Sequence, residues 1–150
     1  MKICLLGPAP PLRGGISHYN QQLALALADR HKVTGISFSR QYPAMLFPGR
    51  TQFDPGPSPP GLIPEPLRDS INPLSWIRAG RRIAEIAPDL IIAHWWHPFF
   101  GPCLGTTVRL ASRRSRSRVI FVGHNVVPHE PFRLARGLTR FALARGDAWL

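Results

Sequence analysis

The sequence predicts an α/β protein with a doubly wound, Rossmann-like parallel sheet that carries helices on both faces. Short apolar runs alternate with longer segments in which apolar residues recur at helical spacing, which is the pattern of repeated strand–helix–strand units. The runs 2–7, 89–93 and 118–123 show no polar alternation, as expected of strands buried on both faces. The chain has 150 residues, a length that suits one domain with a hydrophobic core, so residues 1–150 are expected to form one domain.

The first unit consists of a strand at 2–7, a helix at 17–29 and a strand at 32–38. Apolar residues recur on one side of the helical segment, and Ser17 is expected to cap its first turn. A helix that joins two neighbouring parallel strands makes a right-handed crossover, so this unit is expected to start the sheet.

Residues 40–74 interrupt the alternation, because they contain nine of the 17 prolines of the chain. Proline at this density excludes a helix or a central strand, so a long irregular insertion is expected. The first half of this insertion is expected to pack onto the domain through its apolar and aromatic side chains, which are Tyr42, Met45, Leu46, Phe47 and Phe53.

The remaining elements follow in regular order. Asn72 and Pro73 predict the start of a helix, with Asn72 as its cap, and this helix ends before Pro88. The elements expected after it are a strand at 89–93, a helix at about 101–113, a strand at 118–123, a helix at about 131–145 and a strand from 147. A chain that stops within a strand is expected to be a fragment of a longer protein.

The formal net charge is +11, and 17 of the 19 basic residues are arginine. This excess predicts attraction to the phosphates of a nucleic acid or of an anionic membrane, unless it reflects only a GC-rich coding sequence. No apolar run reaches the roughly 20 residues that span a bilayer, and the start of the chain does not resemble a signal peptide. Cys4 and Cys103 lack metal-ligand spacing, so reduced thiols in a cytoplasmic protein are expected.

In a doubly wound sheet, ligands bind beyond the carboxyl ends of the strands. The candidate functional residues should therefore lie in the segments that follow the predicted strands, which are 7–15, 37–40, 94–97 and 123–125.

Gly14 and Gly15 stand where the first strand is followed by a helix. Glycine lets a ligand approach the backbone closely, and the free N–H groups and dipole of the helix attract anions. The pair therefore predicts a site for a phosphate or diphosphate, with an ordinary flexible turn as the alternative. The fingerprints G-x-G-x-x-G and Walker A are absent.

Two histidine-bearing segments follow buried strands. His124 is expected at the carboxyl edge of the sheet, where it would hydrogen-bond a substrate hydroxyl or transfer a proton, unless it is only a cap. His94 and His97 flank Trp95 and Trp96. A polar pocket rim is favoured over a metal site for these histidines, and the tryptophans either pack in the core or offer a flat surface to a sugar.

Together these pieces resemble the N-terminal domain of a family 4 glycosyltransferase of the GT-B type. The resemblance lies in the order of four stretches and covers nearly the whole chain except 40–74. The four stretches are "PPLRGGISHYNQQLALALADRHKVT", "APDLIIAH", "RVIFVGHNVVPHE" and "ARGDAWL".

The resemblance implies the N-terminal half of a GT-B fold that transfers a sugar from a nucleotide-sugar donor to an acceptor. Gly14 and Gly15 match the glycine-rich turn whose amides face the donor diphosphate, and His124 matches the histidine that contacts the transferred sugar. Asn125 follows His124 where the family often has an acidic or small polar residue. Because this domain usually holds the acceptor, the resemblance also implies acceptor contacts at Arg13, His18 and His97.

The resemblance further implies that the C-terminal donor-binding domain is absent from these 150 residues, so the fragment alone is expected to be inactive. No Asp-x-Asp motif occurs, and no metal or other cofactor is expected. A lipid-linked or cell-envelope glycan is the expected acceptor, and the basic helices would contact the inner face of a membrane. The alternatives are a GT-B sugar-nucleotide epimerase domain and a basic nucleic-acid-binding module. Arginines scattered over several helices disfavour the nucleic-acid alternative, so no nucleic-acid partner is expected.

Overall fold

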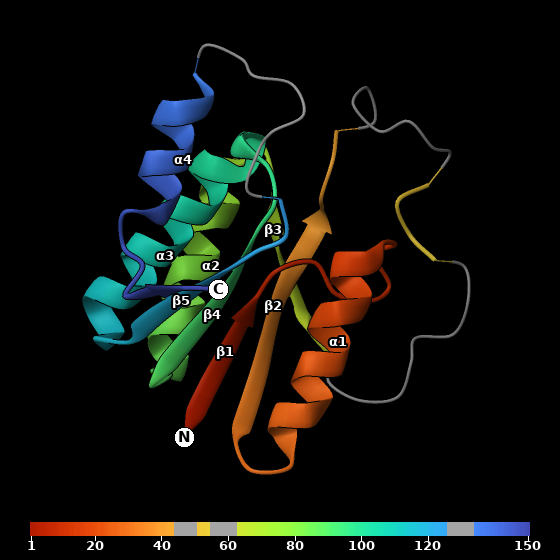
Figure 1. Ribbon diagram of the computed structural model, residues 1–150, viewed down its shortest axis with the longest axis vertical. Helices are drawn as coiled ribbons and strands as arrows, with labels where there is room; N and C mark the ends of the chain where they lie inside the picture. Colours follow the sequence, from red (N-terminus) through yellow and green to blue (C-terminus); the bar gives the residue numbers. More distant parts are fainter. Residues whose placement is uncertain (44–50, 55–62, 126–133) are drawn as a thin grey trace.

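The computed structural model describes residues 1–43, 51–54, 63–125 and 134–150 (Figure 1). The strands are β1 (Lys2–Leu6), β2 (Lys32–Arg40), β3 (Glu65–Asp69), β4 (Leu90–Trp95), β5 (Arg118–Gly123) and β6 (Ala148–Trp149). The helices are α1 (Gly15–Ala28), α2 (Pro73–Ile86), the short 3-10 helix η2 (Pro98–Phe100), α3 (Gly101–Ser115) and α4 (Ala135–Leu143). Strands and helices alternate along the chain, which confirms the predicted α/β class.

The six described strands form one parallel sheet in the order β3-β2-β1-β4-β5-β6. From β1 the chain moves outward to β2 and β3, and it then returns to place β4 on the other side of β1. This reversal between β1 and β4 is the switch point of a doubly wound sheet, where ligands bind beyond the carboxyl ends of the strands. The predicted Rossmann-like, doubly wound topology is therefore confirmed.

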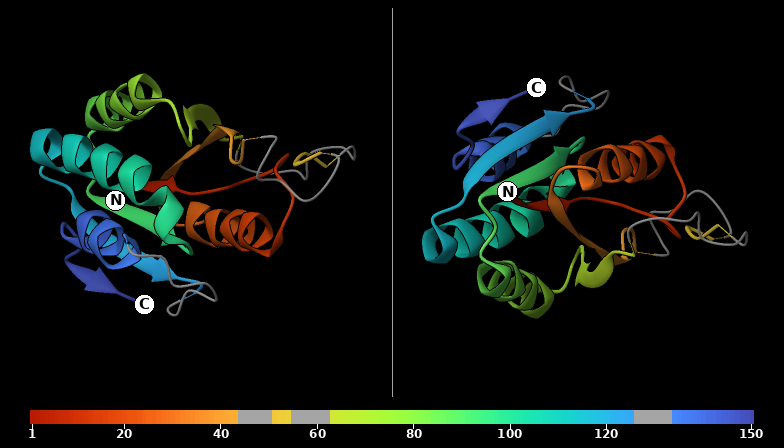
Figure 2. Two further views of the ribbon diagram at one scale, coloured as in Figure 1. Left: turned by 90° about the horizontal axis from the view of Figure 1, so that it is seen from above. Right: turned by 90° about the horizontal axis from the view of Figure 1, so that it is seen from below.

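Helix α1 covers one face of the sheet, and α2, α3 and α4 cover the other (Figure 2). Side chains of β1 alternate between the two layers, as a strand requires. Ile3 and Leu5 pack with Ala24 of α1, whereas Cys4 and Leu6 pack in the larger core beneath the other three helices. These side chains are almost completely buried, so β1 is a central strand as its uninterrupted apolar sequence predicts.

The two predicted helix caps have different outcomes. The Asn72 side chain accepts a hydrogen bond of 3.1 Å from the backbone N–H of Leu74, which confirms Asn72 as the cap of α2. The prediction that Ser17 caps α1 is wrong. The helix begins two residues earlier, at Gly15, with Gly14 as an N-cap that has no side chain, and Ser17 is buried within the first turn.

The prediction of an irregular segment throughout 40–74 is wrong at its end, where β3 pairs with β2 in parallel. This strand lies at the edge of the sheet, which is the position that a strand containing Pro66 can occupy because proline has no N–H to donate. Of the apolar residues expected to pack, Tyr42 is confirmed in the core, whereas Phe53 stays 40% exposed. Met45, Leu46 and Phe47 lie outside the described residues.

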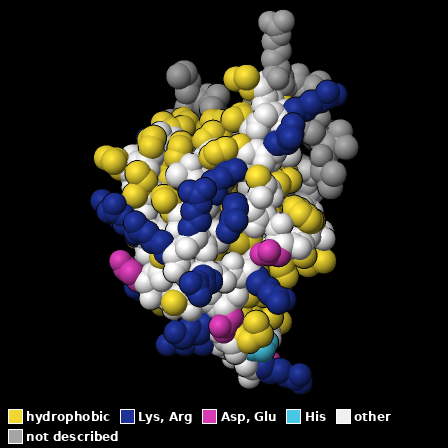
Figure 3. All heavy atoms as spheres, turned by 90° about the vertical axis from the view of Figure 1, so that its left-hand side faces the viewer, with side chains coloured by type: hydrophobic (Ala, Val, Ile, Leu, Met, Phe, Trp, Pro, Cys, Tyr) yellow, Lys and Arg dark blue, Asp and Glu magenta, His cyan; other side chains and the backbone are white. Residues whose placement is uncertain are grey.

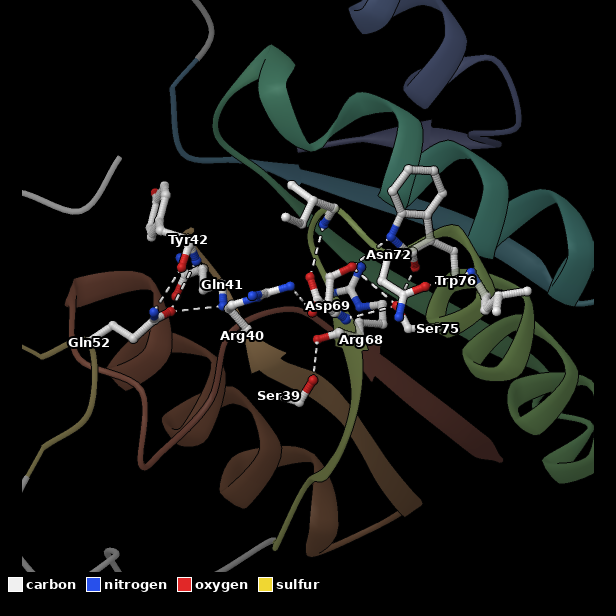
Figure 4. Close-up of polar contacts among 12 residues, drawn as sticks. Ser39, Arg40, Gln41, Tyr42, Gln52, Arg68, Asp69, Asn72, Ser75 and Trp76 are labelled. Atoms are coloured by element: carbon white, nitrogen blue, oxygen red, sulfur yellow. Dashed lines mark hydrogen bonds and ion pairs between the residues drawn. The ribbon is translucent and has the colours of Figure 1, made fainter. Parts of the chain in front are cut away.

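Polar contacts join parts of this proline-rich segment to one another (Figure 4). The amide of Gln52 accepts from the backbone N–H groups of Gln41 and Tyr42, and it donates to the Tyr42 carbonyl. Arg40, at the end of β2, forms an ion pair with Asp69, at the end of β3. The segment therefore starts and ends at the carboxyl edge of the sheet.

The C-terminal elements also follow the prediction. Helix α4 begins at Ala135, whereas the predicted range begins at residue 131, which lies outside the described residues together with 132 and 133. The predicted last strand is confirmed, because Ala148 and Trp149 pair in parallel with β5. No helix in the described part of the chain is both long enough and apolar enough to cross a bilayer.

Candidate functional site

The carboxyl ends of β1, β4 and β5 meet the N-terminus of α1 at one edge of the sheet (Figure 1). The loop that leaves β1 climbs to this edge and turns back into α1, whose axis then runs down the sheet. Backbone contacts hold this loop, because Ala9 N–H donates to Ser37 Oγ and Arg13 N–H donates to the Gln52 carbonyl. The switch point of the sheet therefore has the beginning of α1 on one side and the end of β5 on the other.

The glycine pair forms an open turn at the start of α1. Gly14 has φ of +120°, a conformation that side chains other than hydrogen rarely tolerate. A Cβ built on Gly14 or on Gly15 would meet nothing within 4 Å, and both residues are exposed. No neighbouring described atom fills the space beside this turn, so a ligand can reach its backbone.

The N-terminus of α1 carries no group of its own to balance its dipole. The first intrahelical bond runs from His18 N–H to the Gly14 carbonyl, so the N–H groups of Gly15, Ile16 and Ser17 have no partner within the helix. No side chain caps the helix, and its first turn contains no acidic residue. The Ser17 hydroxyl is buried and has no hydrogen-bond partner among the described residues. This end of α1 is therefore an uncompensated positive pole that suits an anion.

Two histidines contact each other across the ends of β4 and β5. His94 Nδ1 lies 2.8 Å from His124 Nε2, and His94 Nε2 lies 3.0 Å from Asn20 Oδ1. Asn20 in turn donates from Nδ2 to the carbonyl of Pro8 at 2.9 Å. A chain of hydrogen bonds thus links the loop after β1, helix α1, β4 and the residue that follows β5.

Tyr19 of α1 packs edge-on against both imidazoles. Its ring centroid lies 5.3 Å from that of His124 and 5.9 Å from that of His94, with interplanar angles of 78° and 80°. Tyr19 follows Gly15 by four residues, which is about one turn or roughly 6 Å along the helix axis. Helix α1 therefore contacts His124 one turn after the glycine pair.

Burial lowers the pKa of both histidines. His94 is completely buried, and burial, followed by the charges of His124 and Arg68, lowers its pKa to about 3. Burial also lowers the pKa of the half-buried His124. Both imidazoles are consequently neutral near pH 7, and each then has one N–H donor and one bare nitrogen.

The structure shows contacts within the protein for Trp95, Trp96 and His97. Trp95 and Trp96 are only 5% and 8% exposed, so they pack in the core, and a flat sugar-binding surface is excluded for them. His97 accepts a hydrogen bond from the backbone N–H of Phe99 and thereby caps η2. His94 does not form a pocket rim, because its whole side chain is buried.

A metal site at His94 and His97 does not fit this geometry, because both ring nitrogens of His94 are hydrogen-bonded to protein atoms. Within the described ranges, no group of three or more His, Cys, Asp or Glu side chains is arranged to hold a metal ion.

The other candidate residues surround the site edge from different elements. His18 is exposed on the first turn of α1, Arg13 is exposed just before the glycine pair, and Asn125 is exposed next to His124. The structure thus places His124 against Tyr19 of α1, the helix that begins at the glycine turn.

Sequence reasoning missed Asn20, Tyr19 and the bond between His94 and His124. The available signal was Asn20 itself, because it lies at helical spacing from Ile16 and Leu23 on the apolar side of α1 and is buried in the structure. A buried amide needs a hydrogen-bond partner, and a histidine at the end of a neighbouring strand is a suitable one.

The fold and the open glycine turn define a Rossmann-like domain with an exposed helix N-terminus, lacking a capping side chain, at its switch point. A sequence model of glycosyltransferase family 4 matches residues 13–150, and the chain therefore belongs to this family of GT-B domains. A search among curated proteins found no match.

Proposed function

We propose that this chain is the acceptor-side domain of a glycosyltransferase that moves a sugar from a nucleotide-sugar donor to an acceptor. The observation that carries the proposal is that α1 begins at the open turn of Gly14 and Gly15 and, one helical turn later, contacts the half-buried His124 through Tyr19. Glycosyl transfer needs both the glycine turn and the histidine. Negative charge accumulates on the leaving diphosphate, and the transferred sugar must be held in place at the same time.

In this proposal the backbone N–H groups at Gly14 and Gly15 face the donor diphosphate. Fixed amides at a helix N-terminus stabilise the developing charge without reorganising, so no metal or other cofactor is required of this domain. His124 contacts the transferred sugar through a neutral imidazole. Arg13, His18, His97 and Asn125 are proposed as acceptor contacts around the same edge.

We further propose that the 150 residues alone do not turn over a donor. A single domain offers its amides to one side of the diphosphate, whereas the transition state must be surrounded by positive groups to be stabilised. A second, nucleotide-gripping domain would supply the other side, in the same chain or in a separate one.

The experiment is a glycosyl-transfer assay on the enzyme with both domains present, comparing His124→Ala with a matched control, His31→Ala. His31 lies between α1 and β2, at the opposite edge of the sheet. We expect His124→Ala to lower kcat by about a hundredfold, which is typical for loss of a positioned imidazole, and the control to leave it unchanged. Undiminished turnover in His124→Ala would remove this residue from the site.

The acceptor proposed is a lipid-linked or cell-envelope glycan, reached from the cytoplasmic face of a membrane. The face formed by α3 and α4 supports this, because arginine side chains gather there below apolar ones (Figure 3). A hollow of about 530 Å³ is lined by four arginines and one acidic residue, which are Arg113, Arg116, Arg118, Arg145 and Asp147. Burial, followed by the charges of Arg113 and Arg145, lowers the pKa of the nearby Arg109. Crowded cations of this kind favour an anionic surface.

Flotation with vesicles that contain an anionic lipid tests this contact. The chain is expected to float with anionic vesicles at low salt and to be released at high salt, and the double variant Arg113→Glu, Arg145→Glu is expected to remain behind. Arg30→Glu, at the end of α1, serves as the control. Equal flotation with uncharged vesicles would contradict an electrostatic contact.

A further inference from the structure

Asn20 has only one orientation that satisfies both of its hydrogen bonds. The Pro8 carbonyl can only accept, so the group that faces it at 2.9 Å must be the Asn20 amide NH₂. The carbonyl oxygen of Asn20 then faces His94 Nε2 at 3.0 Å. Because that oxygen can only accept, His94 Nε2 must be protonated and must donate the hydrogen bond to Asn20 Oδ1.

The same logic fixes the next bond. A buried, neutral His94 that is protonated on Nε2 has a bare Nδ1, which can only accept. His124 Nε2 lies 2.8 Å from this atom, so His124 must be protonated on Nε2 and must donate. The direction of every hydrogen bond in this series is therefore set by the backbone carbonyl at Pro8.

The two imidazoles meet in a geometry that favours a strong bond. Their planes differ by only 19° and their centroids lie 5.1 Å apart, so with 2.8 Å between the nitrogens the rings meet edge to edge in nearly one plane. The N–H of His124 then points along the lone pair of His94, as a good hydrogen bond requires. Tyr19 packs edge-on against both rings and limits their rotation.

We propose that His94 and Asn20 are positioning residues that hold His124 in the tautomer whose Nδ1 is a bare hydrogen-bond acceptor. A ligand atom that hydrogen-bonds to His124 Nδ1 must then be a donor. This follows from the series of hydrogen bonds through Pro8, Asn20, His94 and His124. Of the groups in a nucleotide-sugar, the sugar hydroxyls can donate and the ionised phosphate oxygens cannot. This assignment of a hydroxyl rests on the proposed function.

Rotation of His124 would lose this selectivity. Without the partner at His94, both ring nitrogens of His124 can exchange roles, and the imidazole can equally donate to a phosphate oxygen or to water. Within the described part of the chain, no hydrogen bond occupies His124 Nδ1. The buried pair therefore acts through His124, and neither His94 nor Asn20 touches the substrate.

The first test is a nitrogen-15 NMR measurement on the chain itself, with labelled histidine, near pH 7.5. We expect protonated Nε2 and bare Nδ1 signals for both His94 and His124, and a scalar coupling across the hydrogen bond between His124 Nε2 and His94 Nδ1. The variant His94→Phe should lose the coupling and show mixed tautomers at His124, whereas the control His31→Phe should leave both signals unchanged. A proton found on His94 Nδ1, or no coupling in the unchanged chain, would overturn the inference.

The second test is the transfer assay on the two-domain enzyme. We expect His94→Phe and Asn20→Leu to lower kcat by about tenfold or more, as is common when a group that orients an active imidazole is lost, with little change in donor KM. Full activity in a folded His94→Phe enzyme would overturn the positioning role. Failure of the proposed function can be distinguished from failure of this inference, because the NMR result does not depend on any sugar transfer. The spectrum of the unchanged chain also decides the tautomer if His94→Phe does not fold.

Discussion

Gly7, at the end of β1, packs directly against the ring of His94 in β4. A Cβ added to Gly7 would lie 2.6 Å from Cδ2 of His94 and 3.0 Å from its Cβ. The ring cannot move aside, because Asn20 and His124 hold its two nitrogens. Glycine at this position therefore makes room for a buried histidine, and the two residues form one structural unit.

This contact predicts that Gly7→Ala destabilises the fold. We expect the free energy of unfolding to fall by about 1–3 kcal/mol, since overpacking in a rigid interior forces side chains off their preferred positions. Urea unfolding followed by circular dichroism measures the change. The control Gly137→Ala is exposed in α4 with nothing within 4 Å of its new Cβ, and it should raise stability by about 1 kcal/mol or less. Equal stability in Gly7→Ala and the unchanged chain would contradict the tight packing.

The sequence predicted the alternation of strands and helices because it depends on local periodicity, which survives even where single residues do not fit the pattern. It also predicted the open turn at Gly14 and Gly15, since two glycines before a helix allow unusual backbone conformations and close approach to the backbone. It did not predict the contact of His94 with His124 and Asn20. These partners are separated by 30 and 74 positions, so only the order of strands in the sheet brings them together.

Two other features were hidden for physical reasons. Strand β3 lies in a proline-rich segment, and its short, irregular pairing at the sheet edge leaves almost no periodic signal. Arg68 of that strand is 1% exposed, although arginine is among the residues least often buried. Its burial follows from the pairing of β3, which turns this side chain toward the core, and nothing in the sequence around it indicates that direction.

The open turn makes a second prediction, for the two-domain enzyme. The Cβ of Gly15→Val would meet no neighbouring protein atom within 4 Å, so the domain should fold, and on the proposed function the added side chain keeps the donor diphosphate away. We expect kcat/KM for the donor to fall by about tenfold to a hundredfold, because removing one anion contact typically costs 1.5–3 kcal/mol. Steady-state transfer assays at several donor concentrations measure it.

The matched control for Gly15→Val is Gly137→Val, which introduces the same side chain at another open helical glycine that lies away from the site edge. It should raise stability by a few tenths of a kcal/mol, about the difference in helix propensity between Val and Gly, and leave donor use intact. If both variants use the donor equally well, the turn at Gly15 has only a structural role.

A third prediction concerns the guanidinium of Arg68, which is buried beside the Cys103 thiol and has no nitrogen or oxygen hydrogen-bond partner among the described residues. Its main compensation is the ring of Phe38, whose centroid lies 4.1 Å from the guanidinium carbon. A buried cation–π contact contributes about 2 kcal/mol, which is less than the several kcal/mol that it costs to remove a charge from water. We therefore expect Arg68→Met, which keeps the length and removes the charge, to raise the free energy of unfolding by about 1–2 kcal/mol.

Urea unfolding measures the stability of Arg68→Met, and Arg40→Met serves as the control. The comparison distinguishes the effect of removing a buried charge from the effect of removing an exposed one. The Arg40 side chain is 47% exposed and pairs with Asp69, so its loss should cost about 1 kcal/mol or less. If Arg68→Met were less stable than the unchanged chain, the guanidinium would have a stabilising role that outweighs its desolvation.

The last prediction is the pH dependence of stability that His94 produces. The pKa of His94 is lowered from 6.5 to about 3, chiefly by burial. Below pH 6.5 the unfolded chain therefore binds a proton that the folded chain does not bind, so stability falls as pH falls. The stabilising contribution is fully present above pH 6.5 and is lost progressively toward pH 3. Between pH 7 and pH 5 this one residue should account for a loss of about 2 kcal/mol in the free energy of unfolding.

Urea unfolding at pH 7, 6 and 5, compared between the unchanged chain and His94→Phe, isolates this contribution. The carboxylates and the other histidines titrate in both proteins, so the difference between the two slopes belongs to His94, whatever the absolute stability of the variant. We expect a flatter slope in His94→Phe. If the variant does not fold, the ring signals of His94 in the unchanged chain give the same answer, because they should stay those of a neutral imidazole at pH 5. Identical slopes, or a charged His94 at that pH, would mean that this ring is not isolated from solvent as its geometry requires.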